Sequence, residues 1–331
     1  MKIFIAFLLL SVMQADKVSN HDTSVSENQN AANSARQGKI RSIVYFSAND
    51  GAFWQNKSRG LPDGIFLTDL ATDGDLLALS TKQHGVFFYD FRSDSWQKTA
   101  MSPPTSQNVD DLLLHEGKIW AGTQNDGVFV SADQGKSWKA LNEGLQNLVI
   151  RRLVAIQNQV WACTNEGLYI LRQNKWQLVK EHPPIQINSI TALDGEIYTG
   201  TTRGIFKNTG KEVSWKPVFQ GKALHNINSI GKNIYVMAYG DLMVSADKGA
   251  TWKNTQEGLP KGLYTFHVIQ SHNTTLAGQW DGVYKMTGTQ QWLKYSNGLP
   301  AKFPAIEMVV FKDLVIAASS GWVEWWRPGA R

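Results

Sequence analysis

The distribution of hydrophobic and polar residues along the chain predicts many short strands and no sustained helix. Apolar segments of four to eight residues alternate with turns that contain Gly, Asn, Asp or Ser. Such segments and turns are typical of β-strands in hairpins. Four of them follow one another between residues 109 and 142: "VDDLLLHE", "KIWAGTQ", "GVFVSAD" and "SWKALN". No stretch sustains the 3.6-residue period of an amphipathic helix.

This four-strand unit recurs at a period near 40 residues. A Trp that follows a polar turn appears seven times, 37 to 42 residues apart: Trp54, Trp96, Trp138, Trp176, Trp215, Trp252 and Trp292. Two further series keep the same phase: "GVFF" at 85, "GVFV" at 127, "GLYI" at 167, "GIFK" at 204 and "GVYK" at 282, then "RGLP" at 59, "EGL" at 143, "EGLP" at 257 and "NGLP" at 297. Four-stranded units at this period predict the blades of a β-propeller.

The two ends of the chain predict a seventh blade. Six full units extend from about Ile65 to Gly298, and residues 40–64 and 304–328 remain. Together these remainders are slightly longer than one blade. We therefore expect an all-β, seven-bladed propeller of four-stranded antiparallel blades over residues 40–331, closed by N- and C-terminal strands in one composite blade. "AFWQNK" should supply its outer strand, while the pairing of "SIVYFS" with "WVEWWR" stays open.

An octapeptide occurs twice, as "SADQGKSW" at 131–138 and "SADKGATW" at 245–252, with a degenerate copy, "SANDGAFW", at 47–54. It falls between the third and fourth strands of its unit. An Asp in such a turn accepts hydrogen bonds from nearby backbone N–H groups, Gly adopts positive φ, and Trp packs between sheets. We therefore predict structural roles for Ser131, Asp133, Gly135, Trp138, Ser245, Asp247, Gly249 and Trp252.

The pattern Ser-x-Asp-x-Gly-x-x-Trp resembles the Asp box, or BNR repeat, and the phased repeats extend this resemblance across residues 40–328. Proteins with this repeat include sialidases, sortilin-type receptors, two-propeller xyloglucanases and photosystem II assembly-factor-like proteins. The resemblance implies a propeller, but the functions of these proteins diverge. The chain is most similar to the non-catalytic, assembly-factor-like branch.

The N-terminal residues predict export. Residues 1–15, "MKIFIAFLLLSVMQA", resemble a secretory signal peptide, with a short membrane anchor as the alternative. Residues 16–39 are polar and predict a disordered tether. No Cys lies near the junction, which argues against a lipoprotein. A secreted or periplasmic protein without a stable membrane span after signal removal is expected.

Composition narrows the classes of function. The net charge of +5 is mild and does not indicate nucleic-acid binding. None of the seven His residues pairs at metal-ligand spacing, and Cys163 is the only Cys, either a buried strand residue or a reactive thiol. A Gly-rich phosphate loop and a Gly-x-Ser-x-Gly elbow are missing from the sequence. We expect no metal, no cofactor and a monomeric propeller.

Turn positions predict which residues surround the mouth of the central channel. Turns alternate between the two faces of an up-and-down blade, so the turns between second and third strands share one face with the connections between blades. We call this the channel-mouth face. The turns place there His84, Gln124, Asn125, Asp126, Glu166, Arg203, Asp241, Trp280 and Asp281. The connections add His182, Lys222, His225, Tyr264 and Phe303. Trp280 could stack on a sugar, receive a partner side chain, or fill the mouth.

Two functions are compatible with these residues. The first is an exported, non-catalytic propeller that binds a protein segment or a glycan on the channel-mouth face. The second is a glycoside hydrolase, sialidase-like or xyloglucanase-like, which needs two carboxylates about 5 to 10 Å apart. Its candidates are the loop acids Asp126, Glu166, Asp241 and Asp281.

Two observations weigh against the hydrolase. A sialidase also needs three converging Arg side chains, and only Arg203 lies in a loop between second and third strands. Arg151 and Arg152 begin a first strand and form either a channel-facing pair or a solvated one. Xyloglucanases work between two propellers, whereas this chain has residues for one.

Overall fold

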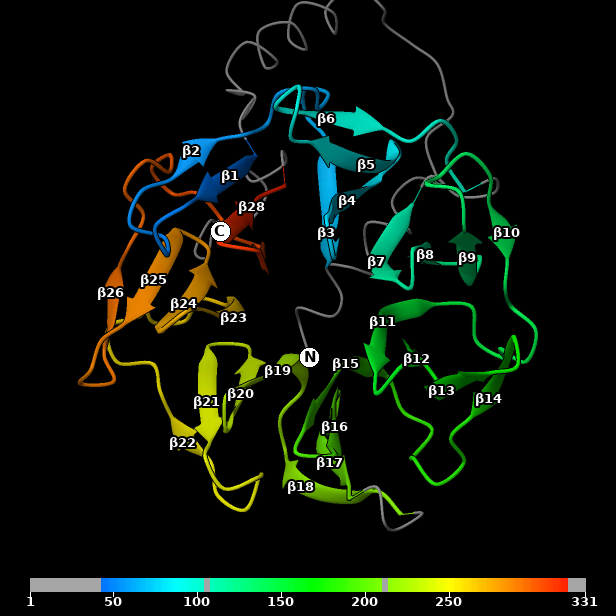
Figure 1. The fold of residues 1–331 in the computed structure, drawn as a ribbon. Coiled ribbons are helices and arrows are strands. Elements are labelled where there is room, and N and C mark those ends of the chain that lie inside the picture. Colours follow the sequence, from blue (N-terminus) through cyan, green and yellow to red (C-terminus); the bar gives the residue numbers. More distant parts are fainter. Residues whose placement is uncertain (1–42, 104–107, 210–213, 321–331) are drawn as a thin grey trace, which may run out of the picture. The chain divides into compact units, whose positions relative to one another are not determined.

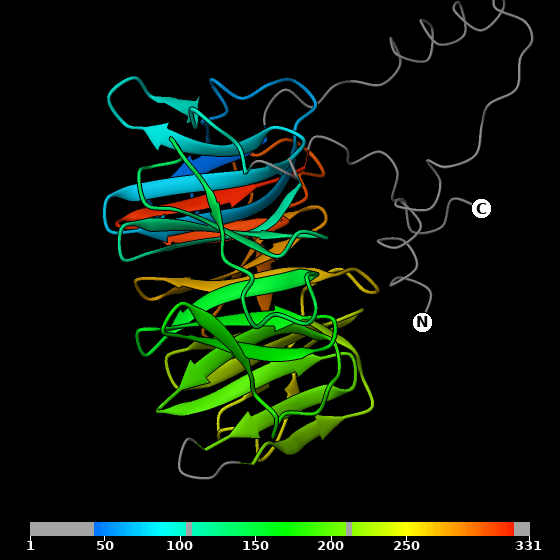
Figure 2. The same cartoon turned by 90° about the vertical axis from the view of Figure 1, so that its right-hand side faces the viewer.

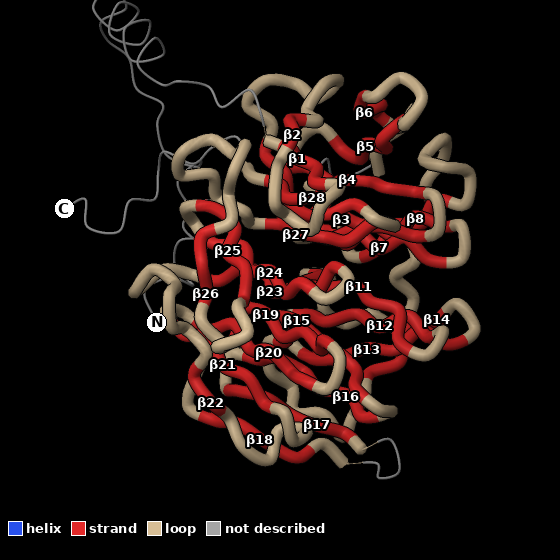
Figure 3. Tube along the Cα trace, turned by 60° about the vertical axis from the view of Figure 1, so that its left-hand side comes forward, coloured by secondary structure: helices blue, strands red, loops and turns tan. Residues whose placement is uncertain are grey.

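The computed structural model describes residues 43–103, 108–209 and 214–320. The predicted signal peptide (1–15) and tether (16–39) lie outside the described residues. Within them, 28 strands form seven four-stranded antiparallel sheets arranged as blades around a central channel (Figure 1). The predicted all-β, seven-bladed propeller is therefore confirmed. The described part of the chain contains strands and loops and no helix that could cross a bilayer (Figure 3).

Each blade is numbered here along the chain, and its strands are given from the inside outward. Blade 1 consists of β3 (Phe66–Asp73), β4 (Leu76–Lys82), β5 (Gly85–Asp90) and β6 (Ser95–Lys98). Blade 2 consists of β7 (Val109–His115), β8 (Lys118–Thr123), β9 (Val128–Ser131) and β10 (Lys139–Ala140). Blade 3 consists of β11 (Ile150–Ile156), β12 (Gln159–Thr164), β13 (Gly167–Arg172) and β14 (Lys175–Leu178).

The next three blades repeat this order. Blade 4 consists of β15 (Ile187–Leu193), β16 (Glu196–Thr201), β17 (Gly204–Asn208) and β18 (Lys216–Gln220). Blade 5 consists of β19 (Leu224–Ile230), β20 (Asn233–Ala238), β21 (Asp241–Ser245) and β22 (Lys253–Asn254). Blade 6 consists of β23 (Thr265–Ser271), β24 (Thr274–Gln279), β25 (Gly282–Met286) and β26 (Trp292–Lys294). In the side view the strands run roughly along the channel direction (Figure 2).

Blade 7 combines both ends of the chain. Its inner strands are β27 (Glu307–Phe311) and β28 (Leu314–Ala318), and its outer strands are β1 (Val44–Ser47) and β2 (Gln55–Asn56). Strand β1 pairs antiparallel with β28, from Val44 opposite Ala318 to Ser47 opposite Val315. The expected closure is confirmed. "SIVYFS" supplies the third strand and "AFWQNK" the outer one, whereas "WVEWWR", at 322–327, lies outside the described residues.

The hydrophobic core is divided among the spaces between blades. Seven buried apolar clusters fill the seven interfaces between neighbouring sheets. Small residues recur in the second strands because neighbouring sheets approach each other closely at these interfaces and leave little room for side chains. A Cβ on Gly122, for example, would lie 2.7 Å from Cγ2 of Ile150 in the next blade. Cys163 is fully buried between blades 3 and 4, where burial raises the pKa of its thiol. That position favours the structural alternative for this residue.

The repeated Trp residues connect each blade to the preceding one. Six of the seven donate their indole N–H to a backbone carbonyl of the preceding repeat; Trp176, for instance, donates to Leu141 at 2.7 Å. The backbone N–H of Trp176 also donates to the carbonyl of Glu143 at 2.8 Å. The next residue, Gly144, approaches so closely that a Cβ would lie 2.0 Å from the carbonyl oxygen of Trp176. The "GL" series therefore marks close contacts between blades, which recur at Gly60, Gly258 and Gly298.

Candidate functional site

The repeated octapeptide forms a self-contained turn. Oδ1 of Asp133 accepts the backbone N–H groups of Lys136 and Ser137 at 3.1 and 2.9 Å. Ser131 Oγ donates to Asp133 at 2.8 Å and accepts the N–H of Gly135 at 2.8 Å. The hydrogen bonds from Ser137, followed by that from Ser131, lower the pKa of Asp133 to about 2. The carboxylate is thus occupied by its own turn.

The other two copies of the octapeptide make the same contacts with partly different residues. Asp247 Oδ1 accepts the N–H of Thr251 at 2.8 Å, and hydrogen bonds from Thr251 and Ser245 lower its pKa to about 2. In the degenerate copy, Asn49 Oδ1 accepts the N–H of Phe53 at 2.9 Å. Because an uncharged Asn performs this role, the turn needs a hydrogen-bond acceptor and not an acid. The contacts favour the predicted structural role.

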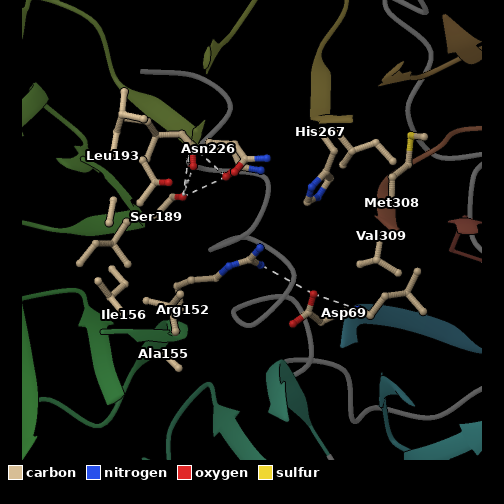
Figure 4. Close-up of a pocket in the computed structure, with 18 of the residues that line it drawn as sticks. Asp69, Arg152, Ala155, Ile156, Ser189, Leu193, Asn226, His267, Met308 and Val309 are labelled. Carbon is tan, nitrogen blue, oxygen red and sulfur yellow. Dashed lines mark hydrogen bonds and ion pairs between the residues drawn. The ribbon is translucent and has the colours of Figure 1, made fainter. Parts of the chain in front are cut away.

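The inner strand of every blade carries a polar residue at the same position, near the start of the strand. Each of these seven residues directly precedes a buried apolar residue of its strand. We call this set the polar ring: Asp69, Asp111, Arg152, Ser189, Asn226, His267 and Glu307. Six of the seven line a cavity of about 590 Å³ that follows the channel (Figure 4). The ring was not predicted as a set, although Arg152 was considered as a channel residue.

A β-bulge lies beside this position in six of the seven blades, whereas β27 of blade 7 pairs with β28 without a register shift. In six blades the pairing of the first two strands shifts register at the same place, for example between Leu67 and Asp69 and between Ile150 and Arg152. A bulge adds one residue to a strand and redirects the side chains beside it. The shift therefore turns a polar residue toward the channel while the next residue enters the core.

Charged members of the ring join blades 1, 2 and 3. Arg152 Nη1 lies 3.2 Å from Asp111 Oδ1 and 3.7 Å from Asp69 Oδ1. Asp69 also accepts the backbone N–H of Leu112 at 2.8 Å, and Asp111 accepts that of Leu153 at 2.6 Å. Burial raises the pKa of Asp111 to about 6 and raises that of Asp69 as well. Burial opposes the charge of Arg152, but its pKa is raised on balance by the two carboxylates.

The other side of the ring is less charged. Ser189 Oγ donates to Asn226 Oδ1 at 2.9 Å, an interaction drawn in Figure 4. His267 Nε2 lies 2.9 Å from Glu307 Oε2, which joins blades 6 and 7. The channel therefore has one wall with an Arg and two buried acids and another with amide, hydroxyl, imidazole and carboxylate groups. Such convergent polar groups in a cavity of this size are typical of small-ligand or side-chain pockets.

Four aromatic rings form a continuous strip on the channel-mouth face of blades 5 and 6. The ring centroids of Tyr239 and Tyr264 are 4.9 Å apart, those of Tyr264 and Phe266 are 6.1 Å apart, and those of Phe266 and Trp280 are 5.0 Å apart. We call these residues the aromatic strip. Tyr239 is 48% exposed, and the other three are partly exposed. Phe266 directly precedes His267 in β23, so one strand carries a member of the aromatic strip and a member of the polar ring.

The predicted channel-mouth residues do not form one cluster, because they come from six blades. Trp280 belongs to the aromatic strip, and His225 stacks edge-on against Tyr264 at 4.9 Å. Asp241 pairs with Lys222 at 2.5 Å. The side chains differ in exposure: Asn125, Glu166 and Arg203 are exposed, whereas His84, Gln124, Asp126, Asp241, Trp280 and Asp281 are partly buried.

Two predicted residues are not available for binding in this structure. His182 is 4% exposed; its Nε2 contacts Thr199 Oγ1 at 2.8 Å, and its ring packs edge-on against Trp215. Burial lowers its pKa to about 4, so the imidazole is neutral at pH 7. Phe303 is also buried, against Tyr45. Both were expected at the surface because they lie in blade connections, but these connections fold back over the core.

His225 has a similar structural contact. Its Nε2 lies 2.7 Å from the carbonyl oxygen of Thr265, which links the inner strands of blades 5 and 6. Burial lowers its pKa to about 4. His225 therefore packs against Tyr264 of the aromatic strip as a neutral ring.

Tyr239 and Phe266 were missed from the sequence. A usable signal exists for Phe266, because the same position is polar in the preceding five blades: Thr68, Asp110, Arg151, Asn188 and His225. In blade 6 the phenyl ring of Phe266 replaces the polar side chain of that series.

The four acids proposed for hydrolysis do not converge. Asp126, Glu166, Asp241 and Asp281 belong to turns of four different blades, and none lines the channel cavity. Asp281 accepts the hydroxyl of Tyr284 and pairs with Lys294 at 2.8 Å. Among residues 43–103, 108–209 and 214–320, no group of His, Cys, Asp or Glu is arranged to hold a metal ion.

Comparison with known proteins places this chain among propellers. The family described as "DUF6242 beta propeller domain" matches residues 70–206. No curated protein matches the chain in sequence. The extracellular domain of BT4673 from B. thetaiotaomicron is 13% identical with a TM-score of 0.64; the match covers 80% of this chain but only 39% of that domain.

Two further solved structures show how widely the fold is shared. YCF48 bound to D1 peptide is 14% identical with a TM-score of 0.61, over 78% of this chain and 93% of YCF48. The GH74 xyloglucanase from Xanthomonas campestris is 14% identical with a TM-score of 0.62, over 78% of this chain and 52% of the enzyme. At such identities the likeness concerns the fold alone. The chain is thus similar to a propeller family and shares its architecture with proteins of unrelated activity.

Proposed function

We propose that this protein is an exported, non-catalytic propeller that binds a protein segment or a glycan on its channel-mouth face. The observation that carries the proposal is the aromatic strip. Exposed aromatic rings that lie next to one another offer buried area and stacking to a partner, and such residues dominate binding energies. Phe266 of the strip directly precedes His267, which lines a cavity with convergent polar groups, and such groups add specificity to an apolar contact.

Other features support parts of this proposal. YCF48, a propeller of similar fold, has been solved with a bound peptide. BT4673 uses a similar propeller in an extracellular domain, and the apolar residues 1–15 fit export. The octapeptide turns, with a carboxylate or amide capping the turn, support a place among Asp-box propellers. The hydrolase alternative has no comparable support, because its candidate acids lie on separate blades.

Binding can be tested without knowledge of the natural partner. The immobilised propeller would be screened against a phage-displayed library of random dodecapeptides and against a glycan array. Trp280→Ala removes one ring of the aromatic strip, whereas Phe91→Ala removes an exposed ring in a turn on the opposite face. We expect ligands that bind the wild type and Phe91→Ala but lose affinity for Trp280→Ala. If ligands bind all three proteins equally, the aromatic strip is not the site.

A further inference from the structure

Glu307 stands out among the charged groups of the polar ring. Asp69 and Asp111 share Arg152, and each also accepts a backbone N–H from the next blade. Glu307 has no such partner: within the described residues its only ion-pair contact is the imidazole of His267. Its carboxylate, about 15% exposed, lines the channel cavity. Among the described residues that line this cavity, Asp69, Asp194 and Glu307 are acidic and Arg152 is the only Lys or Arg, so the site favours a cationic ligand.

The surroundings of Glu307 match a cationic side chain. The cavity of about 590 Å³ is large enough for the end of a Lys or Arg side chain together with water. Asn228 and Thr191 line the opposite wall, where amide and hydroxyl oxygens accept hydrogen bonds from ammonium or guanidinium groups. The aromatic strip adds ring faces at the mouth, and these attract cations.

We propose that the channel cavity receives a Lys or Arg side chain of the bound protein segment, whose charge is held at Glu307 while a neighbouring residue packs on the aromatic strip. This inference rests on the proposed function and narrows its partner to a segment with a basic residue. Arg152 lines the same cavity, but its guanidinium forms ion pairs with Asp69 and Asp111, and the contact with Asp69 is drawn in Figure 4. Within the described residues no ion pair joins Arg152 to Glu307, so the carboxylate of Glu307 is left for the basic side chain of the ligand.

The test uses peptides selected by the wild-type protein from the random dodecapeptide library. The tightest is resynthesised with its basic residue replaced by norleucine or citrulline, which keeps length but removes charge. Isothermal titration should give an affinity about tenfold or more lower for the neutral peptide. Glu307→Gln should cause a similar loss for the basic peptide and almost none for the neutral one, since Gln keeps a hydrogen bond to His267. Glu116→Gln, an exposed Glu in a turn on the opposite face, should change neither.

The outcomes separate this inference from the proposed function. Selected peptides without basic residues, or an unchanged affinity of the neutral peptide, would overturn the inference while leaving the aromatic strip as a binding site. An equal loss for both peptides in Glu307→Gln would assign Glu307 a structural role and also overturn it. If Glu307→Gln folds poorly, the comparison of the basic and neutral peptides on the wild-type protein still tests the inference. If the protein binds glycans but no peptides, the inference is rejected and the proposed function is kept. If it binds neither glycans nor peptides, the proposed function itself is rejected.

Discussion

Arg152 in blade 3 places its Nη1 3.2 Å from Oδ1 of Asp111 in blade 2. The two carboxylates around this guanidinium, those of Asp111 and Asp69, are almost fully buried, whereas Arg152 remains 32% exposed toward the channel. Three consecutive blades are thereby joined through a single cation at the inner edge of the ring. The charges nearest the channel axis therefore hold the propeller together on this side.

Removal of that cation should destabilise the fold. Arg152→Met keeps the apolar stem but leaves two buried acids without their counter-ion, and we expect the free energy of unfolding to fall by about 3 kcal/mol. Urea denaturation measures the change. The triple variant with Asp69→Asn and Asp111→Asn should recover part of the loss, because Asn still accepts the N–H groups of Leu112 and Leu153. Equal stability of the single and triple variants would show that Arg152 acts through packing alone.

The contact between Gly144 and Trp176 allows a matched glycine experiment. Gly144 has φ +91° and no room for a Cβ, whereas Gly195 has φ +81° and open space within 4 Å of the place that a Cβ would take. Both Ala variants bear the same backbone strain, but only Gly144→Ala forces blades 2 and 3 apart. Gly144→Ala should lower the free energy of unfolding by about 1 to 3 kcal/mol more than Gly195→Ala. Similar melting curves for the two variants would contradict the close approach.

Asp133 should stabilise the propeller mainly through its acceptor oxygens, to which its negative charge adds a smaller contribution that depends on pH. Its folded pKa of about 2 lies below the ordinary value of 3.8. The stabilisation is therefore complete above about pH 4 and disappears as the pH falls toward 2. Asp133→Ala should lower the melting temperature by a few degrees at pH 6, and the deficit relative to wild type should shrink toward pH 2. Asp133→Asn, which copies Asn49 of the degenerate repeat, should retain most of the stability; a loss equal to that of Ala would show that the charge is essential.

His272 should make ring closure depend on pH. It lies in the first hairpin turn of blade 6, with Nδ1 2.9 Å from Asp50 and Nε2 3.6 Å from Asp313, both in blade 7. The hydrogen bond and charge of Asp50 raise the pKa of His272 above 6.5. A raised pKa means that the stabilisation is present below pH 6.5 and is lost as the pH rises through the folded pKa. The melting temperature of His272→Asn should therefore fall below that of wild type at pH 5.5 and approach it at pH 8.5. A pH-independent difference would refute the ion pairs.

Arg203 and Trp280 should contribute to binding in physically different ways. Arg203 is exposed in a blade 4 turn, and Trp280 belongs to the aromatic strip. Alanine at either position should weaken binding of a selected ligand by about 1 to 3 kcal/mol. The effect of Arg203→Ala should fade at high salt because it acts through charge, whereas that of Trp280→Ala should persist. Titrations at low and high salt distinguish the two effects. If both variants bind the ligand as tightly as wild type, the site lies elsewhere on the channel-mouth face.

Local patterns along the chain are enough to predict the architecture of this protein. A repeat of about 40 residues with a Trp, a Gly turn and four short apolar segments specifies a blade, because each strand and turn follows from local patterns of side chains. The length left over at the two ends predicted seven blades and their closure. The octapeptide could also be interpreted locally, since Ser131, Asp133 and Gly135 make their hydrogen bonds within one turn.

The inner surface of the channel, in contrast, depends on contacts between distant parts of the chain. Asp69 and Glu307 are far apart in the chain and become members of one ring only when blade 7 closes beside blade 1. In six blades a bulge of one residue lies beside the ring position, and the hydrophobic pattern does not reveal so small a shift. The burial of His182 and the assembly of Tyr239, Tyr264, Phe266 and Trp280 likewise depend on how the loops of neighbouring blades pack. Local sequence specifies the blade, but contacts between blades create the surface that a partner meets.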